Sequence, residues 1–245
     1  APVVSLDSDT EDLVTAFANV EDCHCMLLTE NMRYAGAISA ASLIKVLNEK
    51  QLKTAQDQNP LTGLPGNLAI LDFLRSTCKD GDARRYFCYA DFDNFKPFND
   101  RYGFHAGDHA ITLFAALMRR YFFHDSEFVG HVGGDDFFVG LVGYSEEELV
   151  HPLGRLLNDF AAEVAELYSD EDRERGFIMG HDREGNERRI ELMRCSIGVL
   201  EIPEGVVISD LDRISTEIAG VKACAKKSKT GLCICLYGAG ADHHG

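Results

Sequence analysis

The sequence predicts an α+β domain, with a central and mostly antiparallel sheet flanked by helices, preceded by a small N-terminal α/β segment. An apolar run of strand length at 86–92 is followed by helical spacing of apolar residues from 98 to 120. Two further apolar runs, 128–132 and 137–142, flank a Gly-Gly-Asp-Asp turn and predict a hairpin. Helices packed over such a sheet define the α+β class.

The first part of the chain is predicted to form a small unit of its own. Its elements are a helix (9–18), two strands (25–28 and 33–38) and a helix (40 to about 55). Ser39 is placed to cap the second helix, and Pro60 follows the polar stretch that ends it. We therefore expect a boundary near residue 57.

The second part of the chain is predicted to supply the rest of the sheet and its helices. The remaining elements are helices at 68–78, 145–168 and 209–226, a hairpin of 176–179 with 188–201 that turns through 182–186, and a last strand at 232–237. Ser145 is a suitable N-cap, with three glutamates in the following turn.

Composition limits the possible partners. The net charge of −16 and the sequence pI of about 4.9 argue against a nucleic-acid polymer, which is bound through clustered Lys and Arg. Although 45% of the residues are apolar, no apolar run approaches the roughly 20 residues of a membrane span, so no membrane segment is expected. The chain opens on Ala-Pro-Val-Val without a signal peptide, which indicates a piece of a longer, cytoplasmic protein.

The eight cysteines are interpreted as mostly reduced and buried thiols, because they lie in apolar stretches without paired C-x-x-C knuckles. The alternative is a zinc site that combines Cys23-His24-Cys25 with Cys233-Ile234-Cys235. A C-x-C pair within a strand places both thiols on one face of the sheet.

An acidic arrangement between residues 91 and 136 carries the functional prediction. The segment Asp91-Phe92-Asp93-Asn94-Phe95-Lys96 ends a predicted strand, and Gly133-Gly134-Asp135-Asp136-Phe137 forms the tip of the predicted hairpin. Carboxylates from these two places can converge on Mg²⁺, which takes oxygen ligands and usually enters with substrate phosphates. The alternative without a functional role is a pair of solvated turns, since Gly and Asp are ordinary hairpin residues.

These motifs resemble the GGDEF domains, which are diguanylate cyclases and their inactive relatives. The resemblance covers roughly residues 57–238 and includes the opening Thr62-Gly63-Leu64-Pro65. The segments 26–29 and 34–39 resemble half of a cystathionine-beta-synthase-type (CBS) module. We accordingly predict a partial CBS-like segment with its connecting helix at 1–56, a GGDEF domain at 57–240 and a tail at 241–245.

The resemblance implies a metal site and a phosphate site. Asp91, Asp135 and the carbonyl of Phe92 would bind Mg²⁺ or Mn²⁺, whose charge offsets the repulsion between carboxylates. The backbone amides from Asp93 through Asn94 to Phe95 would approach the β- and γ-phosphates of GTP.

The resemblance also implies the remaining site residues. Asn99 and Asp108 would bind guanine, while Lys96, Lys226 and Lys229 would meet phosphate oxygens. The catalytic candidates are Asp135, Asp136 and Lys96, with Asp136 helping to deprotonate the 3′-hydroxyl or hold a second cation.

The implied reaction condenses two GTP into cyclic di-GMP and two pyrophosphates. Each domain holds one GTP, so two domains must face each other in a homodimer. The alternative is a catalytically weak or inactive GTP-binding domain that regulates an EAL phosphodiesterase domain absent from this chain. Larger signalling proteins that carry EAL, CBS and GGDEF parts have the corresponding order of segments.

Several departures from the family pattern bear on activity. Asn59 replaces the usual Asp of the opening signature, Asp136 replaces the commoner Glu, and the segment 225–230 lacks the usual Arg. His124 and Glu127 stand where the inhibitory product site has Arg and Asp, so no product inhibition through that site is expected.

Overall fold

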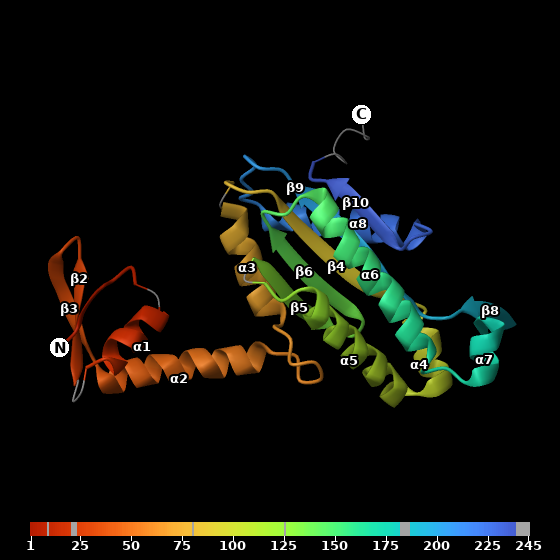
Figure 1. Ribbon diagram of the computed structural model, residues 1–245, viewed down its shortest axis with the longest axis horizontal. Helices are drawn as coiled ribbons and strands as arrows, with labels where there is room; N and C mark the ends of the chain where they lie inside the picture. The colour runs from red at the N-terminus through yellow and green to blue at the C-terminus, as the bar shows by residue number, and fades with distance from the viewer. Residues whose placement is uncertain (9, 21–23, 80, 125, 182–186, 239–245) are drawn as a thin grey trace. The chain divides into compact units, whose positions relative to one another are not determined.

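The computed structural model describes residues 1–8, 10–20, 24–79, 81–124, 126–181 and 187–238 (Figure 1). The chain divides into two compact units, Ala1–Gln56 and Asp57–Gly245.

The first unit contains a three-stranded sheet and helices. Its elements are β1 (Val3–Ser5), α1 (Thr10–Ala18), β2 (Cys25–Glu30), β3 (Arg33–Ser39) and α2 (Ala40–Asp57), whose last residue belongs to the second unit. Strand β2 pairs in parallel with β1 and antiparallel with β3. The three-residue strand β1 was not predicted, since a segment this short has no readable period.

The second unit is built on a five-stranded sheet in the order β10-β9-β4-β6-β5. Its strands are β4 (Arg85–Asp93), β5 (Glu127–Gly133), β6 (Asp136–Val142), β9 (Arg194–Ile202) and β10 (Leu232–Leu236). All neighbours are antiparallel except β9 and β10, which are parallel. This mixed architecture, with helices against a mostly antiparallel sheet, confirms the predicted α+β class.

Helices cover both faces of this sheet. The helices of the second unit are α3 (Asn67–Lys79), α4 (Phe95–Tyr102), α5 (Phe104–Tyr121), α6 (Glu146–Ala165), α7 (Asp170–Arg175) and α8 (Leu211–Lys227). Helices α5 and α6 pack over one face (Figure 1), and α3 and α8 share a second apolar core with the other face. The alternation along β4 explains this arrangement, because Tyr86 and Cys88 enter the first core whereas Phe87 enters the second.

Two predicted helices differ from those observed. The spacing at 98–120 belongs to two helices, α4 and α5, which are separated at Gly103 with φ of 85°. The helix predicted at 145–168 ends at Ala165, and the short α7 follows after a new cap at Ser169. In both places a residue suited to a helix boundary was present in the sequence but was outweighed by apolar periodicity.

The single strand predicted at 188–201 is wrong. The chain instead forms β8 (Glu187–Glu191), which pairs with β7 (Phe177–His181) in a separate two-stranded sheet, and then β9 in the central sheet. The intervening Met193 is buried, and its backbone N–H donates to the hydroxyl of Tyr168 at 2.7 Å. This tertiary hydrogen bond satisfies the backbone N–H of Met193 between the two strands. The turn predicted at 182–186 lies outside the described residues.

The interpretation of the cysteines is wrong in part. Cys224 and Cys233 form a disulfide, which joins the end of α8 to β10. Cys78, Cys88 and Cys195 are buried free thiols, as expected. The pairing was not predictable because a helical and a strand cysteine meet only through tertiary packing. Cys23 lies outside the described residues.

Within the part of the chain that the structure describes, no helix combines the length and apolar character needed to cross a membrane.

Asp172, on α7, anchors α4 to the segment after α6. Its side chain is 2% exposed, and its Oδ2 accepts hydrogen bonds from the Tyr102 hydroxyl at 2.5 Å and from Arg101 Nε at 3.2 Å. The bond from Tyr102 and then the one from Arg101 lower the pKa of Asp172 against the opposing effect of burial. The ionised carboxylate is therefore the form that stabilises the fold.

Replacing Asp172 by Asn should reduce the free energy of unfolding at pH 7 by about 2–3 kcal/mol, because charged hydrogen bonds are lost. The stabilisation by Asp172 is fully present above its ordinary pKa of 3.8 and is lost as the pH falls below that value through the lower folded pKa. Denaturant unfolding at pH 7 and pH 3 should thus show a smaller difference between the two proteins at pH 3. An equal difference at both pH values would contradict this linkage.

Candidate functional site

Three acidic side chains meet at one end of the central sheet. Asp91 lies near the end of β4, directly opposite Asp136 at the start of β6. Asp135 occupies the turn that precedes Asp136. Burial, followed by the negative charges of Asp91 and Asp136, raises the pKa of Asp135. The predicted strand end and hairpin tip therefore lie close enough for their charges to interact.

Two lysines of α8 compensate this negative charge. Lys222 Nζ lies 3.2 Å from Asp91 Oδ2 and also bonds Asp136 Oδ1. Lys226 Nζ lies 2.5 Å from Asp91 Oδ1. Burial opposes the charge on Lys222, but its bond to Asp136 and the charges of Asp136 and Asp91 raise its pKa. Lys226 had been predicted from the resemblance, whereas Lys222 had not.

A close helix–sheet contact places α8 beside these carboxylates. Gly198 on β9 faces α8, and a Cβ added there would lie 2.6 Å from the carbonyl carbon of Val221 and 2.8 Å from the backbone nitrogen of Lys222. Only a glycine lets the backbone of α8 approach the strand this closely. The position of Lys222 thus depends on a residue in another element.

The chain turns sharply between β4 and α4. Asn94 is the N-cap of α4 and has φ of 66°, a left-handed conformation. Its side chain does not cap the helix; its Nδ2 instead donates to the carbonyl of Glu191 at 3.1 Å. Asp93 is held separately by Ser196 Oγ at 2.5 Å and Arg194 Nε at 2.9 Å. The first turn of α4 therefore keeps backbone amides that the cap side chain does not use, an arrangement suited to anions.

Asn99 lies against the first turns of α5. Its Oδ1 is buried and accepts no hydrogen bond from the described residues. A Cβ at Gly107 would lie 2.0 Å from this atom, so the glycine provides the space that Asn99 occupies. Asp108 follows Gly107 and is exposed. Asn99 and Asp108, the predicted guanine-binding pair, thus lie on neighbouring turns of α4 and α5.

A buried histidine, His131, packs against the turn of the hairpin that carries Asp135 and Asp136. The two turn glycines, Gly133 and Gly134, have φ of 144° and 58°. His131 is 2% exposed, stacks on Phe137 with ring centroids 4.2 Å apart, and its Nε2 lies 2.9 Å from the carbonyl oxygen of Gly134. Burial lowers the pKa of His131. A neutral imidazole therefore supports the turn without adding charge beneath the carboxylates.

The opening Thr-Gly-Leu-Pro segment packs against this hairpin. Thr62 Oγ1 lies 3.0 Å from His131 Nδ1, and the Pro65 carbonyl accepts from the His131 backbone N–H at 2.8 Å. Asn59, which replaces the usual Asp, still accepts from the backbone N–H groups of Leu61 and Thr62 at 3.0 and 3.1 Å. This departure therefore leaves the local turn intact.

The donor set fits a hard divalent cation. Asp91 and Asp135 supply carboxylate oxygens, and buried Asp91 Oδ1 has the Lys226 ammonium nearby but no hydrogen bond from the described residues. Carboxylate and backbone carbonyl oxygens are ligands that Mg²⁺ and Mn²⁺ accept. The side chain of Phe92, whose carbonyl was the third predicted ligand, is packed in the core.

Two predicted lysines are not brought to the carboxylates. Lys96 in the first turn of α4 and Lys229 beyond α8 are both exposed, and neither forms an ion pair with another described residue. The signal that could have identified Lys222 is its spacing of four from Lys226, which puts both on one face of α8.

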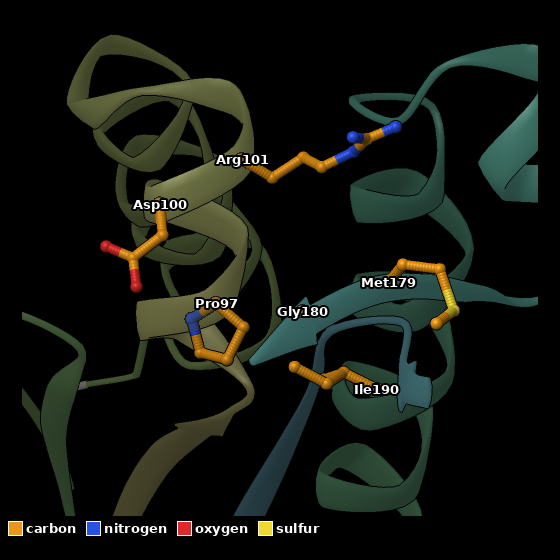
Figure 2. A pocket seen from close by; sticks show the side chains of 6 residues that line it. All are labelled: Pro97, Asp100, Arg101, Met179, Gly180 and Ile190. Atoms are coloured by element: carbon orange, nitrogen blue, oxygen red, sulfur yellow. The ribbon is translucent and has the colours of Figure 1, made fainter. Parts of the chain in front are cut away.

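A pocket of about 360 Å³ lies between α4 and the β7–β8 hairpin (Figure 2). It is lined by Pro97, Asp100, Arg101, Met179, Gly180 and Ile190. Figure 2 shows Pro97, Asp100 and Arg101 along α4 and Met179 and Ile190 on the hairpin. None of the predicted metal ligands lines this pocket, and Arg101 is already paired with Asp172.

The fold and site define an α+β domain with a carboxylate cluster where β4 ends beside the turn of the β5–β6 hairpin. Comparison with known families gives a match to "Diguanylate cyclase, GGDEF domain" over residues 56–175. The chain therefore contains a GGDEF domain.

Similar curated proteins share this region. The chain is 32% identical over 123 residues to diguanylate cyclase DgcP of Pseudomonas aeruginosa, which covers 47% of this chain and 17% of that protein. It is 28% identical over 110 residues to cyclic di-GMP phosphodiesterase PdeR of Escherichia coli, covering 44% and 16%. The chain thus spans about a sixth of these relatives.

Solved structures support the fold. The coiled coil and GGDEF domain of DgcB from Caulobacter crescentus, in complex with c-di-GMP, matches with a TM-score of 0.58 at 18% identity, over 80% of this chain and 95% of that one. The FimX GGDEF domain from Pseudomonas aeruginosa matches with a TM-score of 0.53 at 17% identity, over 73% and 99%.

Proposed function

We propose that this GGDEF domain binds GTP together with Mg²⁺ or Mn²⁺ and condenses two GTP into cyclic di-GMP and two pyrophosphates as a homodimer. The observation that carries the proposal is the meeting of Asp91, Asp135 and Asp136 beside two lysines of α8. A cyclase and a phosphodiesterase of cyclic di-GMP both match over this region, which supports cyclic di-GMP signalling as the context.

Each part of GTP has a matching group in this proposal. Asn99 and Asp108 bind the guanine edge, with the buried Oδ1 of Asn99 gaining the partner that it lacks in the protein. The backbone amides at the start of α4 and the side chain of Lys96 meet the phosphates. Lys226 of α8 lies beside Asp91 and contacts the phosphates from the side opposite α4.

Catalysis in this proposal consists mostly of aligning the 3′-hydroxyl of one GTP with the α-phosphorus of the other. The divalent cation, when bound by Asp91, Asp135 and the Phe92 carbonyl, neutralises phosphate charge and polarises the phosphoryl oxygens. Asp136 accepts the proton of the 3′-hydroxyl that attacks the α-phosphorus, and the Lys222 ammonium donates a hydrogen bond to this carboxylate. Because one site holds one GTP, a second domain must present the partner nucleotide.

A regulatory GTP-binding domain is the second candidate. Lys222 contacts both Asp91 and Asp136 and so competes with a cation for the same oxygens. A protein that binds GTP here without turnover would control an attached EAL phosphodiesterase.

Incubation of the chain with GTP and Mg²⁺, followed by chromatographic separation of the nucleotides, distinguishes the two candidates. Cyclic di-GMP and pyrophosphate in a 1:2 ratio support the cyclase. GTP binding without product supports the regulatory domain, and absence of both binding and product contradicts each of them.

The role of Gly107 gives a sharper prediction for guanine binding. Replacing Gly107 by Ala should displace Asn99 and weaken GTP affinity about tenfold, because the new methyl group takes the space of Asn99 Oδ1. The free energy of unfolding should change by less than about 1 kcal/mol, since Ala favours a helix and the displaced atom belongs to a side chain. Calorimetric titration with GTP measures the first effect.

Gly154→Ala on α6 is the matched control, because a Cβ there meets no atom within 4 Å. Its GTP affinity should equal that of the unaltered protein. Equal affinity in Gly107→Ala would contradict the assignment of Asn99.

For the first unit, we propose a partial CBS-like segment that packs either as a dimer contact or as a truncated edge, in a cytoplasmic protein. Its exposed apolar side chains support the dimer contact: Met32 and Tyr34 on the β2–β3 hairpin are 96% and 71% exposed. Such a contact would bring two GGDEF domains onto one assembly.

A further inference from the structure

Three cysteines meet where the end of α8 packs against β10. Cys224 projects from α8 and is exposed, while Cys233 and Cys235 are partly buried. The two strand residues share a face because they are two positions apart. Their Sγ atoms lie 3.7 Å apart, and all three Sγ atoms lie within 4.8 Å of one another.

The position of the third sulfur does not suit disulfide exchange through Cys233. Thiolate attack forms a mixed disulfide through a nearly linear arrangement of three sulfurs. A linear arrangement would place Cys233 Sγ between the other two sulfurs, about 2.05 Å from Cys224 Sγ and 3.7 Å from Cys235 Sγ. The Sγ atoms of Cys224 and Cys235 would then lie more than about 5.5 Å apart. The outer sulfurs here lie within 4.8 Å. The three atoms therefore form a compact triangle.

A compact triangle of sulfurs suits a shared metal ion. Two thiolates on one tetrahedral zinc, with Zn–S bonds of about 2.3 Å, lie about 3.8 Å apart. Cys233 and Cys235 already have this spacing. Cys224 is the exposed member and leaves a path from solvent, so water can complete the coordination. Thiolates select soft or borderline ions such as Zn²⁺ over Mg²⁺.

We propose that Cys224, Cys233 and Cys235 form a thiolate site for Zn²⁺ once the Cys224–Cys233 disulfide is reduced. A dithiol or phosphine reductant supplies two electrons, and two protons convert the disulfide into two thiols. Binding of Zn²⁺ then displaces the protons of the three thiols and forms three Zn–S bonds. The oxidised and the metal-bound forms both join α8 to β10, but by different bonds.

This site is separate in chemistry from the carboxylate cluster. The carboxylates supply hard oxygen ligands, whereas the cysteines supply sulfur. Cys224 lies on the same helix as Lys222 and Lys226, so either linkage also restrains the segment that carries these lysines.

The test uses the full chain, reduced with a phosphine and freed of reductant and metal under anaerobic conditions, then titrated with Co²⁺. We expect one equivalent to bind with an intense near-ultraviolet sulfur-to-cobalt band, which added Zn²⁺ should abolish. Cys235→Ser and Cys224→Ser should each lower Co²⁺ affinity at least about tenfold, because one thiolate ligand is lost. Cys224 is exposed on a helix, so its variant tests the site even if Cys235→Ser folds poorly.

Cys25→Ser is the matched control, since Cys25 is an exposed cysteine on β2 in the other unit. Its Co²⁺ binding should equal that of the unaltered chain, and protein with an intact disulfide should give no thiolate band. Absence of the band in the reduced chain would overturn the proposal, as would unchanged affinity in Cys224→Ser.

Discussion

Replacing Asp91 by Asn is expected to weaken Mg²⁺-dependent GTP binding at least about 100-fold, because the cation that binds with the triphosphate loses a charged ligand. Asp91 is central because it is paired across strands with Asp136 and contacts both Lys222 and Lys226. Asn preserves the shape but removes the negative charge. The loss should therefore appear in the cation-dependent part of binding.

Calorimetric titration with GTP, in the presence of Mg²⁺ and then of a chelator, measures this part. The matched control is Asp72→Asn on α3, whose carboxylate is 67% exposed and lies in a surface ion pair with Arg75. Its affinity should be unchanged. Thermal unfolding of both variants separates a local loss of ligand from a loss of fold. Unaltered GTP affinity in a folded Asp91→Asn protein would refute the metal site.

Replacing Gly198 by Ala should damage both the fold and the site. The new methyl group would lie within 3 Å of backbone atoms of Val221 and Lys222, which cannot rotate out of the way. Helix α8 must then move off the sheet, at a cost of about 3 kcal/mol of unfolding free energy. Because Lys222 and Lys226 move with α8, GTP affinity should also fall in the fraction that remains folded.

Denaturant unfolding and GTP titration below the unfolding transition measure the two effects of Gly198→Ala. Gly220→Ala is the matched control, because Gly220 lies on α8 itself and a Cβ there meets no atom within 4 Å. That variant should be stabilised by about 0.5–1 kcal/mol, as expected for Gly to Ala in a helix. If Gly198→Ala were as stable as the unaltered protein, the close contact of α8 with β9 would not be required.

The central part of the fold could be predicted because local and tertiary preferences agree there. Strand β4 is apolar on both faces, and the two glycines of the hairpin adopt the positive φ that such a turn requires. The strand and the hairpin bring Asp91 and Asp136 opposite each other by register alone. The acidic half of the candidate site was therefore visible in the sequence.

The two lysines of the site and the interruption between strands β8 and β9 both depend on tertiary contacts. Lys222 resembles any exposed helical lysine until Gly198 brings α8 onto the sheet. The separation of β8 from β9 depends on the bond between Met193 and Tyr168, residues 25 positions apart. Likewise, Cys224 and Cys233 meet only because β10 returns alongside β9. No local pattern encodes these pairings.

We propose that GTP and a divalent cation share the carboxylate cluster. A crystal structure of the chain with a non-hydrolysable GTP analogue and Mn²⁺, using the anomalous signal of manganese, tests it most directly. We expect a manganese peak between Asp91 and Asp135, with the triphosphate over the start of α4 and the guanine beside Asn99. Manganese at another place, or an analogue bound away from these carboxylates, would contradict it.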